Sequence, residues 1–249
     1  MVSELFNTLL YQPLYNGLVF FISVAPWGDI GVAVIVLTLL VRGVLFPLSH
    51  KSTKSQVKMR EIEPEIKALK EKHKDKQEQS KKIMELYQKH GLNPFSGCLF
   101  VLVQMPVIIA LYWVFFRGLS AGFDESALYS FVVAPETYNF YFLGFIDMLG
   151  KSFLLAGAAG ISQYFQMALS VPKLEADVSR IGKGNLQEDL MKSFNLQMRY
   201  GLPVFVFVIS YTISAAVALY WLTSNLFSVA HELYVRKKAK TTAISAVED

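Results

Sequence analysis

The stretch VIVLTLLVRGVLFPL, Val34 to Leu48, is almost entirely apolar, yet it contains an arginine at position 42. A guanidinium keeps its positive charge at every pH that a cell experiences. Arg42 lies about 9 Å of helix from Leu48, so its long side chain can snorkel to the lipid headgroups. The alternative is a water-filled cavity open to the cytoplasm, in which a cation would attract an anionic ligand. On either interpretation, the stretch predicts a membrane-spanning helix.

Several other blocks of the chain are as apolar as this one. With 53% hydrophobic residues, the chain is too apolar for an ordinary soluble domain. Crossing a bilayer takes about 20 apolar residues, and only helices or closed barrels can satisfy the backbone there. The blocks do not alternate as barrel strands do. We therefore predict an all-α, polytopic membrane protein. The apolar blocks are 27–48, 95–116, 153–171 and 202–235.

The basic residues are sharply partitioned along the chain. Of the 24 Lys and Arg, twelve lie in 51–93, five in 172–201 and four after Val235, whereas none precedes Trp27. Because basic segments stay on the cytoplasmic side, these three segments are expected inside and the N-terminus outside. The apolar stretch 202–235 then crosses twice, with its turn at SYTIS, Ser210–Ser214. This gives five transmembrane helices, the last two of them short.

The first 26 residues mix apolar residues with Glu4 and several amides. They predict an interfacial amphipathic helix on the outer leaflet, with Tyr11, Tyr15 and Trp27 at headgroup depth. The alternative, an inserted sixth span, would break the charge parity. No basic n-region is present, so a standard signal peptide is not expected.

Segment 51–93 is strongly charged and has helical periodicity. Ile62, Ile66 and Leu69 recur at the spacing of one helix face. After the polar break HKDKQ comes a second stripe, formed by Ile83, Leu86, Tyr87 and His90. We predict a cytoplasmic helical hairpin with a narrow apolar seam. Its twelve basic and seven acidic residues give a net charge of +5. That charge suits either a solvated loop near anionic lipid or a docking surface for a ribosome or targeting factor.

A few polar residues interrupt the remaining spans. Gln104 lies in the second span, Gln166 in the third, and Trp221 and Asn225 in the last. The ordinary role of such amides is hydrogen bonding between helices. Thr38 lies one turn before Arg42, so the first span is polar along two turns. The single cysteine allows no internal disulfide, and no cluster of metal ligands is evident.

Several longer motifs point to a known family. The chain contains VRGVLFPLSHKSTKSQVKM, LYQKHGLNPFSGCLFVLVQMPVIIALYWVF and VALYWLTSNLFSVAHELYV. With these motifs, and from about Tyr11 to Lys238, it resembles the YidC/Oxa/Alb family of membrane protein insertases. It resembles the short bacterial form, without the large periplasmic domain. The family's five-span core and cytoplasmic hairpin match the topology predicted from charge.

The resemblance implies a membrane insertase and chaperone rather than an enzyme, with no cofactor. Hydrophilic ends of nascent membrane proteins would enter a cytoplasm-open polar groove, and their spans would leave sideways into the lipid bilayer. Segment 51–93 would meet a ribosome, the signal-recognition-particle receptor or a Sec translocon. No specific nucleic-acid sequence is expected as a partner, and the expected location is the bacterial plasma membrane. By position, the groove would be lined by Arg42, Thr38, Gln166, Trp221, Gln104 and Asn225.

Another class of protein remains open. A small-anion channel or transporter could use Arg42 to bind its ion, and inverted repeats would favour it. No convincing repeat is evident. The predicted layout is an interfacial helix at 1–26, spans at 27–50, 94–117 and 151–171, an outer loop at 118–150, cytoplasmic segments at 51–93 and 172–200, a two-span hairpin at 201–235 and a cytoplasmic tail at 236–249.

Overall fold

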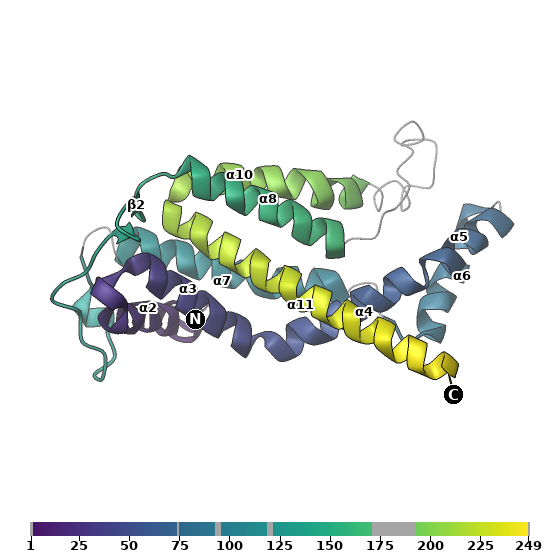
Figure 1. Cartoon of the computed structure of the whole chain (residues 1–249), viewed down its shortest axis with the longest axis horizontal. Coiled ribbons are helices and arrows are strands. Elements are labelled where there is room, and N and C mark those ends of the chain that lie inside the picture. The colour runs from purple at the N-terminus through teal and green to yellow at the C-terminus, as the bar shows by residue number, and fades with distance from the viewer. Residues whose placement is uncertain (1, 74, 93–95, 119–121, 171–192, 249) are drawn as a thin grey trace. The chain divides into compact units, whose positions relative to one another are not determined.

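A computed structural model describes residues 2–73, 75–92, 96–118, 122–170 and 193–248 (Figure 1). These residues are nearly all helical, which confirms the all-α fold class. The chain divides into two compact units, which are described separately. Unit 1 comprises Met1–Phe46, Val101–Gln163 and Val204–Phe227, and unit 2 comprises Pro47–Phe100, Tyr164–Pro203 and Ser228–Asp249.

The long helices carry most of the fold, and a few short elements connect them. The only sheet in the described part of the chain pairs β1 (Tyr141–Phe142) with β2 (Ile146–Asp147) in antiparallel register. The helices are α1 (Val2–Phe6), α2 (Gln12–Val24), α3 (Ile30–Val44), α4 (Phe46–Glu61), α5 (Glu63–Lys72), α6 (Lys76–Lys89), α7 (Ser96–Gly118), α8 (Phe153–Ser170), α10 (Leu202–Ile213) and α11 (Ala215–Glu248). Short 3₁₀ turns are η2 (Pro26–Gly28) and η3 (Glu125–Ala127).

Two π turns share one sequence context. The first, η1 (Asn7–Tyr11), ends where the Gln12 N–H bonds to Asn7 O, and Pro13 follows directly. In the second, η5 (Gln197–Gly201), the Leu202 N–H likewise bonds to the carbonyl five residues back, Gln197 O. Pro203 follows directly. A proline ring crowds the carbonyl four residues back and donates no hydrogen bond, so the helix widens just before it.

The N-terminal helix of unit 1 is packed into the protein. α2 packs against α3, and Tyr15, Leu18 and Ile22 are fully buried. The Tyr15 ring therefore faces a neighbouring part of the protein rather than lipid, while its depth in the membrane stays a prediction. Trp27, in contrast, is 90% exposed. Sequence periodicity cannot distinguish an aromatic residue that faces lipid from one that faces a neighbouring helix.

Side chains of α2 also hold the segment that follows η3. Asn16 Nδ2 donates to Ala127 O at 3.0 Å, and Asn16 Oδ1 accepts from the Tyr129 N–H at 2.6 Å. The Tyr15 hydroxyl accepts from the Asp124 N–H at 2.7 Å. Asn16 is buried, so these bonds satisfy polar groups that water would otherwise have to reach.

α3 begins at a clear cap. The Asp29 carboxylate accepts from the Val32 N–H at 3.1 Å, as an N-cap does, and from the Leu143 N–H at 2.9 Å. At Gly31 an added Cβ would lie 2.3 Å from a ring carbon of Phe142, so only glycine fits this approach.

α3 is shorter than the predicted span 27–50. It ends at Val44, Leu45 is a turn, and α4 begins at Phe46. Pro47 explains the break, since it cannot donate a hydrogen bond to the preceding turn but suits the first turn of a new helix. Ser49 therefore does not continue the helix that carries Thr38 and Arg42.

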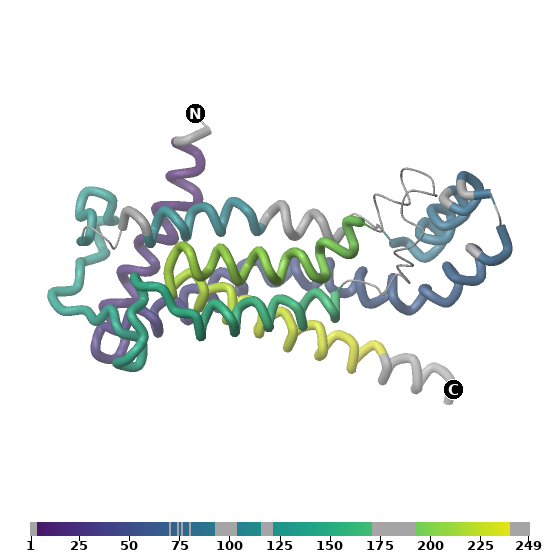
Figure 2. The backbone as a smooth tube through the Cα atoms, turned by 90° about the horizontal axis from the view of Figure 1, so that it is seen from above, coloured from purple at the N-terminus to yellow at the C-terminus, as the bar shows by residue number. Residues whose placement is uncertain are grey.

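The chain reverses between α10 and α11. The helix is interrupted at Ser214, inside the Ser210–Ser214 segment, and the two helices fold back on one another (Figures 1 and 2). The Ser214 hydroxyl accepts from the Val217 N–H, and the Ala215 N–H donates to Gly150 O at 2.8 Å. α8 runs beside α10, where the rings of Phe153 and Phe207 meet edge-on.

Two stretches of the described chain meet the length and apolarity needed to cross a membrane. One is Ser193–Ile213, and the other is the pair α3 and α4, which qualifies only when counted together across Leu45. Gln104–Phe115, within α7, is a shorter apolar helix. The count of five spans and the sidedness of each segment stay predictions.

In unit 2, α5 and α6 pack together through one apolar cluster. Ile62, Leu86 and Leu92 are buried in it, and Met59, Ile66, Leu69 and Tyr87 pack around them. The Asp75 carboxylate caps α6 by accepting from the Gln77 N–H at 3.1 Å. The predicted helix start at Asn93 and Pro94, and most of the predicted loop 172–200, lie outside the described residues.

Candidate functional site

Arg42 lies in the interior of unit 1. It occupies the last turn of α3 and is only 5% exposed. Its Nε donates to the Ser224 hydroxyl of α11 at 2.9 Å, and its Nη2 donates to the same oxygen. The guanidinium therefore points into the helix packing, and the snorkelling interpretation does not describe this conformation.

A line of polar groups continues from Ser224 through α11 to α7. Tyr220 lies one turn before Ser224, so the two hydroxyls share one face of α11. Gln104 Nε2 donates to the Tyr220 hydroxyl. The Gln104 amide oxygen is buried and has no hydrogen-bond partner among the described residues. A cation and a buried acceptor thus lie at opposite ends of one line of polar side chains.

Asn225 belongs to a different contact. Its Nδ2 donates to the Ser162 hydroxyl at 3.1 Å and lies 3.4 Å from Ala159 O, both on α8. Small residues on this face of α8, such as Ala156, let the two helices approach closely. This is the interhelical role that amides ordinarily have in membrane proteins.

The other sequence-predicted residues differ in what surrounds them. Thr38 is buried, and its hydroxyl donates to Val34 O of its own helix at 2.6 Å. Trp221 is buried beside Tyr220, with ring centroids 6.4 Å apart. Gln166 is half-buried and belongs to unit 2, so its place is described apart from that of Arg42.

Sequence reasoning missed Ser224 and Tyr220 as members of the site. Their four-residue spacing was a usable signal, since it puts two hydroxyls on one helix face beside the face of Trp221 and Asn225. Arg42 and Ser224 are 182 positions apart, however, and spacing carries no information at that range. No group of three or more His, Cys, Asp or Glu is arranged to hold a metal ion in the part of the chain that the structure describes.

The fold and this site define a class, a helical membrane protein with a buried cation on an apolar helix. The family model of the 60Kd inner membrane protein matches residues 21–242. The chain therefore belongs to this family, as the sequence motifs predict.

Individual relatives cover most of the chain. It is 32% identical over 212 residues to the membrane protein insertase YidC of Fusobacterium nucleatum, covering 85% of this chain and 88% of that protein. Identity to the protein of the same name from Clostridium tetani is 32% over 215 residues, covering 85% and 84%. The Pelobacter propionicus protein of that name is 31% identical, covering 92% of this chain but only 39% of its own length.

Proposed function

We propose that this protein is a membrane protein insertase of the bacterial inner membrane. It receives hydrophilic ends of nascent membrane proteins from the cytoplasm and releases their apolar segments into the bilayer. The proposed topology has five spans, with the N-terminus outside and the C-terminus in the cytoplasm. The chain is not an enzyme, because the family to which it belongs is one of non-enzymatic insertases.

One observation carries this proposal beyond family membership: the buried Arg42 guanidinium at the end of a line of polar side chains. A permanent cation in a low-dielectric interior attracts carboxylates more strongly than it would in water. Acidic residues near the end of a nascent span are therefore the substrate feature that we assign to Arg42. Transfer of the apolar segment into lipid would supply the driving force without a nucleotide.

The remaining predicted residues have graded roles in the proposed groove. Gln104 has a buried acceptor that a substrate N–H or a water can satisfy. Trp221 offers an apolar wall, whereas the role of Gln166 rests on its position in the sequence alone. Thr38 and Asn225 hydrogen-bond within the protein, so their proposed role is to shape the groove.

Segment 51–93 is the proposed contact for cytoplasmic partners. Its net charge of +5 favours acidic protein surfaces or RNA, so a ribosome, the signal-recognition-particle receptor or a Sec translocon are candidates. Reconstitution without any of them would show what the chain does alone.

Insertion into liposomes tests the proposal. The purified protein is reconstituted, and a single-span substrate with an acidic outer tail is added without nucleotide. Insertion above that into empty liposomes is expected. Arg42→Gln should lower it about tenfold, the value of one charge-assisted hydrogen bond of about 1.5 kcal/mol. Arg42→Lys should lose less, because the charge remains.

Two controls separate charge in the groove from charge elsewhere. Lys151→Gln removes one exposed positive charge from the same unit and should leave insertion unchanged. A substrate whose acidic tail residues are replaced by amides should insert equally with Arg42 or Gln at this position. Equal loss for both substrates would mean that Arg42 only supports folding.

A further inference from the structure

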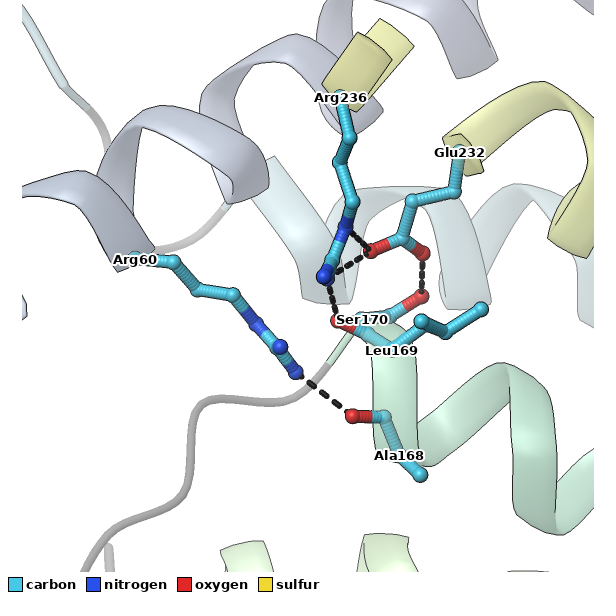
Figure 3. Close-up of polar contacts among 6 residues, drawn as sticks. All are labelled: Arg60, Ala168, Leu169, Ser170, Glu232 and Arg236. Atoms are coloured by element: carbon cyan, nitrogen blue, oxygen red, sulfur yellow. Dashed lines mark hydrogen bonds and ion pairs between the residues drawn. The ribbon is translucent and has the colours of Figure 1, made fainter. Parts of the chain in front are cut away.

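In unit 2, two arginines from different helices meet at the C-terminal end of α8 (Figure 3). Arg60 of α4 donates from Nη2 to Ala168 O at 2.8 Å. Arg236 of α11 donates from Nη2 to Leu169 O, the next carbonyl. The last carbonyls of a helix have no partner within the helix and carry partial negative charge, so cations are favourable there.

One carboxylate already balances part of this charge. Glu232 is buried, its Oε1 accepts from Arg236 Nε at 3.1 Å, and its Oε2 accepts from the Ser170 hydroxyl at 2.6 Å (Figure 3). Both carboxylate oxygens of Glu232 are thus engaged. Little capacity remains in Glu232 to neutralise a further arginine.

A third arginine, Arg199, adds to the positive charge. Its charge and that of Arg236 both act on Arg60, against the carboxylates of Glu232 and Glu63. Burial is the first cause that lowers the pKa of Arg60, and the charge of Arg236 is the second. The three arginines and the carboxylates of Glu232 and Glu63 together carry a net charge of +1. The group of Arg60, Arg199 and Arg236 is called the arginine cluster below.

Arg199 also has capacity to bind a ligand. Its Nε is buried and has no hydrogen-bond partner among the described residues. It lies in the π turn η5, whose widened backbone precedes Pro203. Such turns recur at functional sites because they displace side chains from the regular helix positions.

The residues next to the cluster suit a membrane surface. Tyr200 follows Arg199, and its side chain is more than half exposed. Leu233, three residues before Arg236 and so on the same face of α11, is also exposed. Exposed tyrosines mark the headgroup level of a bilayer, and adjacent apolar side chains can contact acyl chains.

We propose that the arginine cluster binds the phosphate of an acidic phospholipid headgroup. A phosphodiester is anionic, and its oxygens accept from several guanidinium N–H groups at once. Free phosphate has the same oxyanion chemistry, but the exposed Leu233 and Tyr200 favour a ligand with acyl chains. The inference rests on the membrane location in the proposed function and is independent of insertion activity.

Lipid retention by the full-length protein tests this site. The protein is purified in neutral detergent, mixed with equal amounts of phosphatidylglycerol and phosphatidylcholine, and analysed by native mass spectrometry. Selective retention of phosphatidylglycerol is expected. Arg199→Gln should reduce it about tenfold, the loss of one charge-assisted hydrogen bond. Arg199→Lys should retain more lipid than Arg199→Gln, because it keeps the charge.

Lys58→Gln is the matched control, since it removes one exposed positive charge from the helix that carries Arg60. It should bind lipid as the unchanged protein does, and circular dichroism should show the same helicity for all variants. Equal lipid loss in Lys58→Gln and Arg199→Gln would overturn the site. So would displacement of the lipid by equimolar inorganic phosphate or by an acidic peptide, which would identify a different ligand.

Discussion

Replacing Asn16 with alanine should loosen the segment that follows η3 while leaving the helices in place. Asn16 is the buried side chain of α2 that bonds to Ala127 O and to the Tyr129 N–H. Alanine removes both bonds. It also prefers the helical conformation more strongly than asparagine does, so α2 itself should stay intact. The effect should therefore be confined to the tie between α2 and this segment.

The magnitude follows from those two bonds. Each is worth about 1 kcal/mol net, and alanine returns about 0.5 kcal/mol in helix propensity. The expected cost is about 1.5 kcal/mol, which corresponds to roughly a tenfold rise in the population of the locally opened segment. Local opening, rather than global unfolding, is the process that these bonds oppose.

Hydrogen–deuterium exchange in detergent measures that opening directly. Peptides covering 122–132 should exchange about tenfold faster in Asn16→Ala, with the Tyr129 amide most affected. Asn7→Ala is the matched control, because Asn7 is exposed and precedes α2 in the same continuous helical run. Unchanged exchange in Asn16→Ala, or an equal rise in both variants, would refute the reasoning.

Further variants test packing and charge in both units. Gly31→Ala should lower the thermal unfolding midpoint, since overpacking against Phe142 costs about 1–3 kcal/mol and alanine returns about 1 kcal/mol. Gly43→Ala meets no atom within 4 Å and should raise the midpoint slightly. Leu86→Ala, in the α5–α6 cluster, should cost about 2–4 kcal/mol and speed trypsin cleavage there. Burial raises the pKa of Tyr87, so its stabilising contribution is complete below its ordinary value, about 10, and is lost as the pH rises beyond it. Tyr87→Phe should flatten the fall in melting temperature between pH 9 and 11.

Each of these has an outcome that would contradict it. Equal midpoints for the two glycine variants would mean that Phe142 yields at no cost. Unchanged cleavage in Leu86→Ala would show that the cluster does not hold α5 and α6 together. An alkaline fall of the same steepness in Tyr87→Phe would place the titrating group elsewhere.

The features of the fold that follow from local pattern could be predicted. Ile62, Ile66 and Leu69 repeat at helical spacing, and the structure finds them in one apolar cluster with Leu86 and Tyr87. The break at Leu45 was not predicted, although Pro47 signals it. When an apolar run continues across a proline, the sequence does not distinguish a helix that bends there from one that ends there.

The site was predictable only in part. Arg42 stands out because charge is rare in an apolar run, and this holds whatever surrounds it. Its partner Ser224 does not stand out, because a serine is common in membrane helices and the pairing spans most of the chain. Tyr15 shows the same limitation, since its burial depends on how α2 packs against α3.

The long sequence separation of these contacts also fixes an order of events during synthesis. Ribosomes make the N-terminus first, so Arg42 is incorporated 182 residues before Ser224. The end of α8 likewise lacks the guanidinium of Arg236 until 67 more residues have followed Leu169. The interior of unit 1 and the end of α8 can therefore be completed only when the last helix has been translated. A ribosome stalled before that point would hold a chain in which the Arg42 guanidinium still lacks the Ser224 hydroxyl as its hydrogen-bond partner.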